Sequence, residues 1–217
     1  FIKLASTGAL GISSLGYISC QSQKEIFFKL SLAQWSLHKA IQGGEMSPYL
    51  FAEKSKNLGF TGLEYVNQLY DDVMLSDDKS SSIKNFIKQS NQLASDNGVE
   101  NVLIMIDEEG YLADENEAVR LQAVDNHKLW IDAAAEMNCS SVRLNLYGSK
   151  DVETWKALSI DSLGKLGEYA KGSGLNVIVE NHGRITSNIP ELMNAINGVD
   201  MENVGTLPDF GNFCMAD

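Results

Sequence analysis

Two short stretches near the C-terminal end of the sequence place a carboxylate directly after an apolar run. The run Leu175–Val179 ends at Glu180, and His182 follows two residues later. A second run, Val204–Leu207, leads to Asp209. A buried strand does not carry a charge unless the charge is paired or binds a ligand. We therefore expect Glu180 and Asp209 to meet at one end of a sheet, in a metal site or an acid/base site.

The elements that must position these groups follow from the hydrophobic pattern. Apolar runs rich in β-branched residues alternate with amphipathic helical patterns, and Gly or Asn marks most connections. The pattern predicts strands over residues 30–36, 61–66, 99–106, 141–146, 175–181 and 204–209, and helices over residues 48–57, 82–96, 115–137, 152–171 and 189–196. Such alternation is typical of parallel strands joined by right-handed crossovers.

Two α/β architectures satisfy this alternation, a doubly wound sheet and a (β/α)₈ barrel. A nucleotide-binding sheet has little support because the sequence contains neither Gly-x-Gly-x-x-Gly after its first strand nor a P-loop. Polar groups that follow several different strands favour the barrel. We predict a (β/α)₈ TIM barrel over residues 25–217, of which this sequence holds about six of the eight units.

The alternation of side chains along a barrel strand predicts which further groups face the interior. If Glu180 points inward, His182 lies on the same side. The same reasoning turns Glu64 of the second strand inward, and Arg143 and Asn145 of the fourth. This number of polar side chains facing the interior of a barrel indicates a binding site. For Glu64 and Arg143, a structural ion pair is an equal alternative.

Charge and cysteine content exclude two other classes of protein. A formal net charge of −12 without a basic run argues against a nucleic-acid partner. Three cysteines at scattered positions are too few for a disulfide framework or a zinc cluster. We expect Cys139 and Cys214 to be buried as small hydrophobic residues.

Residues 1–24 differ in composition from the rest of the chain. No charge lies between Lys3 and Lys24, and the intervening run is rich in Gly and Ser and too weakly apolar to span a membrane. This pattern is typical of an export signal. Tyr17-Ile18-Ser19-Cys20 resembles a lipoprotein cleavage box with Cys20 as a lipid anchor, although Tyr17 stands where Leu is usual. We predict a periplasmic or membrane-anchored protein of a bacterial envelope. The alternative is a disordered tail on a cytoplasmic protein.

Several motifs, in the same order, resemble one known family. Val179-Glu180-Asn181-His182-Gly183 and Asp209-Phe210-Gly211-Asn212-Phe213 are similar to the sugar phosphate isomerase/epimerase group of the xylose isomerase-like TIM barrels. Gly62-Leu63-Glu64-Tyr65 resembles the second strand of that family, and residues 31–38 resemble the first. The resemblance covers residues 29–217.

The resemblance implies a divalent metal held by four side chains, of which Glu180 and Asp209 match the first two. A histidine and a second glutamate would follow Asp217, so we expect a longer gene product and an inactive 1–217 chain. Carboxylate-rich ligation suits Mn²⁺, Mg²⁺ or Co²⁺, with Zn²⁺ as a further candidate. In the family the metal stabilises an enediolate while two glutamates move the proton, so Glu180 would be both a ligand and the acid/base.

Other side chains are candidate contacts to a sugar. His182 and Asn212 can bond hydroxyl groups, or they can stabilise Glu180 and its turns. Trp35 can stack on a sugar face or belong to the core, and His38 follows it closely. With Glu64, Arg143 and Asn145, these residues form the predicted substrate set. His127, in mid-helix, is expected to be structural or exposed.

These inferences predict a metal-dependent isomerase or epimerase of a sugar or sugar derivative. No cluster of Arg and Lys offers a phosphate site, which favours a free or keto sugar or a glycoside. One alternative is a lyase or hydrolase of 3-keto-glycosides, and another is an exported sugar-binding barrel without turnover. A DNA-repair endonuclease would need more histidines and a basic groove. A homo-oligomer is compatible with the sequence.

Overall fold

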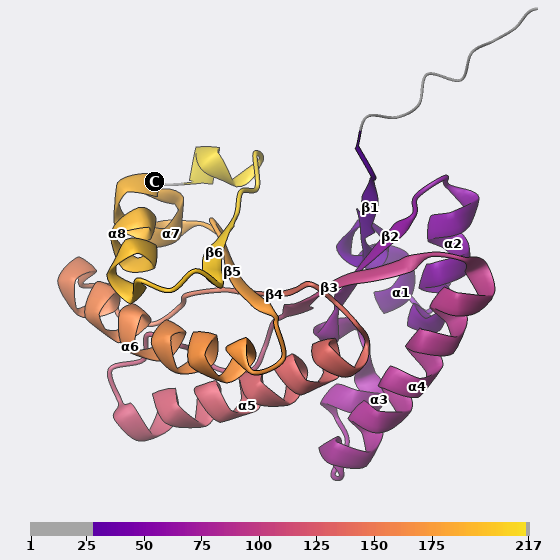
Figure 1. The fold of residues 1–217 in the computed structure, drawn as a ribbon, viewed down its shortest axis with the longest axis horizontal. Coiled ribbons are helices and arrows are strands. Elements are labelled where there is room, and N and C mark those ends of the chain that lie inside the picture. The colour runs from indigo at the N-terminus through magenta and orange to yellow at the C-terminus, as the bar shows by residue number, and fades with distance from the viewer. Residues whose placement is uncertain (1–27, 216–217) are drawn as a thin grey trace, which may run out of the picture.

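Six parallel strands form one sheet in the computed structural model, which describes residues 28–215 of the chain. Each strand pairs with its neighbour in the sequence, from β1 to β6 (Figure 1). The strands are β1 (Ser31–Ala33), β2 (Gly62–Val66), β3 (Glu100–Ile106), β4 (Ser141–Leu144), β5 (Asn176–Glu180) and β6 (Val204–Leu207). Parallel strands paired in chain order are the arrangement of a (β/α)₈ barrel, which confirms the predicted fold class for these six strands.

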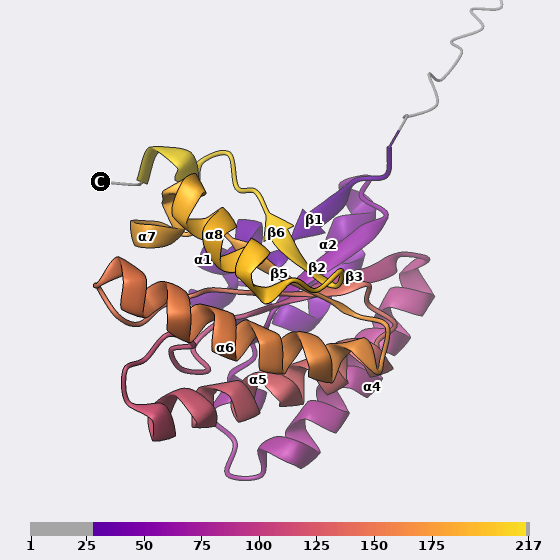
Figure 2. The same ribbon diagram turned by 60° about the vertical axis from the view of Figure 1, so that its left-hand side comes forward.

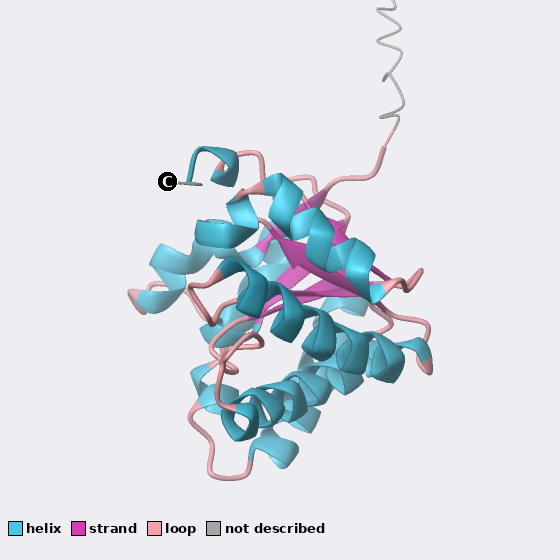
Figure 3. Ribbon diagram, turned by 90° about the vertical axis from the view of Figure 1, so that its left-hand side faces the viewer, coloured by secondary structure: helices cyan, strands magenta, loops and turns pink. Residues whose placement is uncertain are grey.

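Helices cover the sheet on its outer side (Figure 3). The α-helices are α1 (His38–Gln42), α2 (Phe51–Asn57), α3 (Asp71–Met74), α4 (Lys79–Asn97), α5 (Glu117–Glu136), α6 (Val152–Lys171), α7 (Arg184–Ser187) and α8 (Ile189–Val199). The 3₁₀ helices are η1 (Gln34–Leu37), η2 (Pro48–Leu50), η3 (Asn67–Leu69) and η4 (Asn212–Met215). Helix α6 packs between α5 and α8, as Figure 2 shows.

Side-chain caps begin the three longest helices. Asp78 accepts a hydrogen bond from the backbone N–H of Ser81 before α4, and Asp151 accepts one from Thr154 before α6. Asn116 caps α5 in the same way. Each cap satisfies a backbone donor that a helix leaves free at its first turn. These local signals explain why the predicted and observed helix starts agree to within a few residues.

The first strand is shorter than the prediction of residues 30–36, because the chain turns into η1 at Gln34. The side chain of Gln34 is fully buried and makes three hydrogen bonds. Its amide donates to the carbonyl of Pro48 at 3.1 Å and to the Tyr70 hydroxyl at 2.9 Å, and its oxygen accepts from the N–H of Val66 at 3.1 Å. These tertiary bonds stabilise a turn where the local pattern predicts a strand.

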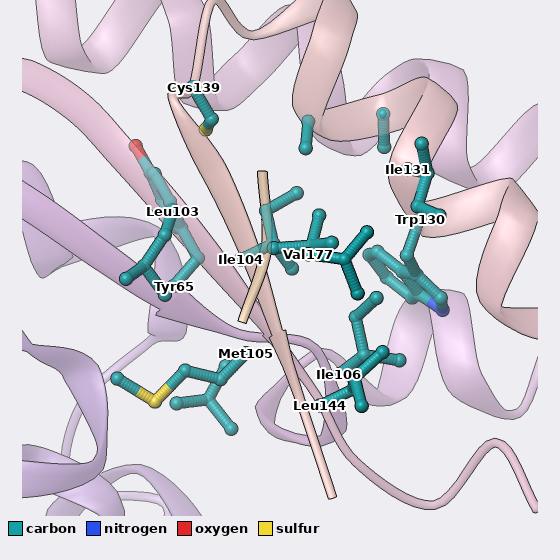
Figure 4. Packing of buried hydrophobic residues seen from close by; sticks show 14 of the residues in the cluster. Tyr65, Leu103, Ile104, Met105, Ile106, Trp130, Ile131, Cys139, Leu144 and Val177 are labelled. Atoms are coloured by element: carbon teal, nitrogen blue, oxygen red, sulfur yellow. The ribbon is translucent and has the colours of Figure 1, made fainter. Parts of the chain in front are cut away.

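The hydrophobic core lies between the sheet and the helices (Figure 4). Ile104, Leu144 and Val177 come from three adjacent strands, and Trp130 comes from α5; all four are fully buried. Cys139 is buried as predicted, and burial raises the pKa of its thiol to about 12. This core fixes the strands whose ends carry the polar groups.

Some predictions concern residues that the structure does not describe. The predicted leader, residues 1–24 with Cys20, lies outside the described residues, and so does the side chain of Cys214. Within residues 28–215, no helix has the length and apolar character needed to cross a membrane.

Candidate active site

A cavity of about 1420 Å³ opens where the strands end, and each of the six strands contributes to its wall. The predicted site residues all line this cavity: Trp35, His38, Glu64, Arg143, Asn145, Glu180, His182, Asp209 and Asn212. The carboxyl ends of parallel strands meet at one edge of a sheet, which brings together residues far apart in the sequence.

Alternation along the strands places these groups as expected. In β4, Val142 and Leu144 are fully buried in the hydrophobic core, whereas Arg143 between them lines the cavity. In β2, Leu63 belongs to the core and Glu64 lines the cavity. A period of two therefore separates the core face from the cavity face in β2 and β4.

The two carboxylate oxygens of Glu180 have different surroundings. The residue is 6% exposed at the end of β5. Its Oε1 accepts a hydrogen bond from Asn212 Nδ2 at 2.9 Å, and His182 Nδ1 lies 2.9 Å from the same atom. Its Oε2 lies 2.7 Å from Arg143 Nε, but this N–H does not point at the oxygen as a hydrogen bond requires. Glu180 thus has one oxygen held by hydrogen bonds and one that meets only a positive charge among the described residues.

His182 and Tyr147 flank Glu180 on the open side. A carboxylate can only accept a hydrogen bond, so His182 Nδ1 carries the hydrogen in this contact. The bond to Glu180 raises the pKa of the half-buried His182 above its usual value, although burial opposes the shift. Burial raises the pKa of Tyr147, and the nearby Asp107 and Glu180 charges add to this. Both side chains can therefore donate hydrogen bonds near neutral pH.

Asp107 is a member of the site that the sequence reasoning missed. It follows β3, and its Oδ1 accepts hydrogen bonds from Arg143 Nη1 at 2.9 Å and Asn145 Nδ2 at 2.6 Å. Asn67, fully buried after β2, fixes the backbone of Asp107 by bonds to its carbonyl at 2.9 Å and its N–H at 2.8 Å. The signal was present: Asp107 ends an apolar strand, as Glu180 does. Two further acidic residues follow Asp107, and the run therefore has the composition of a solvated turn.

The alternative of a structural pair between Arg143 and Glu64 is wrong. Arg143 pairs with Asp107 on one side and with Glu180 on the other. Glu64 accepts a hydrogen bond from the hydroxyl of Ser31 on the adjacent strand β1. Arg143 is paired to carboxylates on the two strands next to its own, because neighbouring strand ends are closer than those across the sheet.

Asp209 lies beyond the end of β6, in a loop fixed by its neighbours. Asn181 bonds its backbone on both sides, at 2.9 Å to the carbonyl and 2.7 Å to the N–H. Its Oδ1 accepts hydrogen bonds from the backbone N–H of Gly211 at 2.7 Å and of Asn212 at 3.2 Å. Asn212 then links this loop to Glu180. In the structure Asn212 and His182 both contact Glu180, as the positioning alternative in the sequence analysis proposes.

The donor set fits a divalent metal only as two of its ligands. Glu180 and Asp209 line one cavity from adjacent strands and offer carboxylate oxygens, which hard divalent ions prefer. Across the described part of the chain, no group of three or more His, Cys, Asp or Glu side chains is placed to hold a metal ion. The residues present could therefore hold one side of a metal ion but not enclose it.

The remaining candidates lie at the rim or the back of the cavity. Trp35 and His38 stack with ring centres 4.2 Å apart, and Trp35 is 41% exposed, so it does not belong to the core. His127 is 2% exposed, with Nδ1 2.7 Å from the carbonyl of Ala123, and burial lowers its pKa. Of the two predicted alternatives, structural or exposed, the structure excludes the exposed one.

A second buried carboxylate, Glu109, was also missed by the sequence reasoning. It is 3% exposed, and its Oε1 accepts hydrogen bonds from Lys79 Nζ and Trp130 Nε1, each at 2.5 Å. Gly110, with a φ of 99°, allows the loop to approach α5, because a Cβ there would lie 2.8 Å from a side chain of that helix. Glu109 is thus held by Lys79 and Trp130 in the wall of the cavity.

A comparison with known protein families identifies the family of this barrel. The sequence profile of the xylose isomerase-like TIM barrel matches residues 52–217, which is more than half of the chain. The chain belongs to the xylose isomerase-like TIM-barrel family. No curated protein sequence gives a significant match. The family membership agrees with the resemblance found in the motifs around Glu180 and Asp209.

Solved structures share this barrel at low sequence identity. The 3-keto-D-glucoside 4-epimerase YcjR from E. coli is 17% identical with a TM-score of 0.62, and the match covers 76% of this chain and 64% of that one. The D-psicose 3-epimerase of Clostridium cellulolyticum H10, with D-tagatose, is 16% identical with a TM-score of 0.67, covering 87% and 65%. The IOLI protein with a zinc atom is 16% identical with a TM-score of 0.65, covering 88% and 66%. The chain thus spans less than two thirds of the length of these structures.

Proposed function

We propose that the gene product carrying this sequence is a metal-dependent isomerase or epimerase of a sugar or sugar derivative. It acts by removing a proton next to a carbonyl group and returning it. The observation that carries the proposal is the Glu180 carboxylate, which stands in a cavity at a strand end with one oxygen held and the other free to accept a proton. The sugar epimerases among the similar structures support the same class of reaction.

Glu180 is the proposed base, and its neighbours fix its position. Asn212 and His182 hold Oε1, so Oε2 keeps one orientation. The Glu180 side chain therefore loses no further conformational freedom when it reacts. The positive charge of Arg143 faces Oε2 and offsets part of its negative charge. In an isomerisation Glu180 returns the proton to the adjacent carbon on the same face, while the hydroxyl proton moves between the two oxygens. In an epimerisation Glu180 keeps the proton that it removed, and a second acid delivers one to the opposite face of the same carbon.

Glu180 and Asp209 are the proposed ligands of the metal from this chain. A bound divalent ion supplies positive charge that stabilises negative charge on the substrate oxygens. Mn²⁺, Mg²⁺ and Co²⁺ suit the two carboxylates, and the zinc atom in the IOLI structure supports Zn²⁺ as a further candidate.

The charge of the cavity favours an uncharged substrate over a sugar phosphate. Among the described residues, the only Lys and Arg side chains in its wall are Lys39 and Arg143, against six carboxylates. Arg143 is already paired to Asp107 and Glu180. A phosphate would meet net negative charge without a free bidentate arginine. Exposed rings at the rim, such as those of Trp35 and Tyr111, offer apolar faces on which a sugar ring can stack.

Deuterium exchange tests the proposal. The gene product is incubated with Mn²⁺ in D₂O with D-fructose, D-tagatose, D-psicose or a 3-keto-glucoside, and proton NMR follows each carbon-bound hydrogen. We expect one sugar to lose a signal next to its carbonyl. Glu180→Gln should lower this rate by about 100-fold or more, the contribution of a general base. The control Glu100→Gln changes an exposed glutamate at the start of β3 and should have no effect. Exchange that is absent for every sugar, or unchanged in Glu180→Gln, would overturn the proposal.

A further inference from the structure

The hydrogen bonds of Arg143 are directed away from Glu180. Its Nη1 donates to Asp107 at 2.9 Å, and its Nη2 contacts the sulfur of Met105 at 3.6 Å. The third position, Nε, is enclosed and makes no hydrogen bond within residues 28–215, although it lies 2.7 Å from Glu180 Oε2. An arginine next to a carboxylate usually forms two parallel hydrogen bonds with it. Here Arg143 forms no such pair: it makes one hydrogen bond to Asp107 through Nη1 and none to Glu180.

The backbone around Asp107 explains why it can hold the arginine. Asn67 is fully buried and bonds both the N–H and the carbonyl of Asp107, in the manner of a strand partner. Asn145 donates a further bond of 2.6 Å to the same oxygen that accepts from Arg143. A carboxylate fixed by three neighbours is pre-organised, and its bonds to a cation are stronger than neutral ones.

This arrangement leaves Glu180 Oε2 with a nearby positive charge but without a hydrogen bond from any described residue. We propose that Asp107 is a positioning residue that prevents Arg143 from forming a two-bond pair with Glu180. This arrangement of Asp107 and Arg143 keeps Oε2 available to a proton or a ligand, while the arginine still neutralises part of the negative charge. It acts through Arg143 and requires no contact between Asp107 and the substrate. Its role in catalysis rests on the proposed function of Glu180.

The proposal predicts that loss of Asp107 is harmful because Arg143 remains. In Asp107→Ala the guanidinium is free to turn and pair with Glu180 through two hydrogen bonds. We expect sugar exchange to fall by about 100-fold, with most of the loss in kcat, since a displaced catalytic group costs this much. Asp107→Asn keeps an oxygen in place but loses the charge, so its loss should be smaller. Asp161→Ala removes a carboxylate that faces Arg120 on the helices outside the cavity, and should leave the rate unchanged.

A double variant separates this role from a structural one. Arg143→Met removes the guanidinium, so the additional change Asp107→Ala should then cost nothing further. We expect the double variant to exchange protons at the rate of Arg143→Met alone, and at least about tenfold faster than Asp107→Ala alone. A structural role for Asp107 would make the double variant the slowest of the three. Equal thermal unfolding midpoints for Asp107→Ala and the wild type would show that misfolding does not cause the loss.

NMR of the substrate-free protein gives a readout that does not depend on activity. The Nε–H signal of Arg143 is assigned as the one that disappears in Arg143→Met. In Asp107→Ala this proton should move downfield and exchange more slowly with water, because it now bonds Glu180. If it does so while no sugar is turned over, the proposed function fails and the positioning by Asp107 stands. An unchanged signal, a double variant no faster than Asp107→Ala, or a folded Asp107→Ala at the wild-type rate would each overturn the proposal.

Discussion

Glu180 and Glu109 are two carboxylates buried to nearly the same extent, at 6% and 3% exposure, but their partners differ. Glu109 lies in the cavity wall and accepts hydrogen bonds from Lys79 and Trp130, each at 2.5 Å. Glu180 accepts hydrogen bonds from Asn212 and His182, and its cation Arg143 lies beside Oε2 without hydrogen-bonding it. A buried charge that is hydrogen-bonded to its counter-ion stabilises the fold, whereas one whose counter-ion makes no hydrogen bond with it retains the capacity to react. Burial alone does not distinguish them; the set of partners does.

The largest expected difference is in stability. Glu109→Gln leaves Lys79 and Trp130 facing an amide in place of a charge, and should lower the free energy of unfolding by about 2–3 kcal/mol. Glu180→Gln keeps partners for its oxygen and should change the free energy of unfolding by less than about 1 kcal/mol. Urea denaturation measures both variants. Equal losses of unfolding free energy in the two variants would show that the two carboxylates stabilise the fold to the same extent.

A smaller effect is expected from the indole donor of Glu109. Trp130→Phe removes the N–H that bonds Glu109 and keeps an aromatic ring in the core. The variant should lose about 1–2 kcal/mol of unfolding free energy. In the background of Glu109→Gln the same substitution should cost less, because the charge-assisted bond is already absent. If Trp130→Phe lowered the unfolding free energy by the same amount in both backgrounds, the loss would come from packing alone.

The smallest expected effect concerns His127, a buried residue of the same cavity wall. Burial lowers the pKa of His127, against the nearby charges of Glu109 and Asp107, while Lys79 adds to the lowering. The unfolded chain therefore binds a proton near pH 6.5 that the folded protein does not. The resulting stability is complete above pH 6.5 and is lost as the pH falls below it, by at most about 1.4 kcal/mol per pH unit. His127→Gln should flatten the dependence of the unfolding free energy on pH between 7 and 5. If the unfolding free energy of His127→Gln depended on pH as steeply as that of the wild type, this prediction would be contradicted.

The local pattern was sufficient to predict the fold and most of the site. Alternation along β4 was enough to separate Arg143, which lines the cavity, from Leu144 in the core. It predicted Glu180 and Asp209 at strand ends because a charge after an apolar run needs a site. Such arguments use only the periods of strands and helices, which the sequence carries directly.

The partners of each group were not predictable in the same way. Asp107 and Glu109 lie in a run of acidic residues that has the composition of an exposed turn. Their burial depends on Arg143, Lys79 and Trp130, each of which lies at least 21 residues away. Gln34 likewise ends β1 through bonds to distant residues. Hydrogen bonds of this kind leave no periodic trace in the sequence.

The sequence by itself determined the six-strand α/β barrel order, the inward set of polar side chains and the family. The tertiary structure decided which carboxylate Arg143 bonds, which oxygen of Glu180 remains free and which buried acid is only structural. The physical reason is the range of the forces involved. Backbone periodicity and apolar burial act on neighbours in the chain, whereas a hydrogen bond or ion pair depends on the angle and distance between atoms that only the closed sheet brings together.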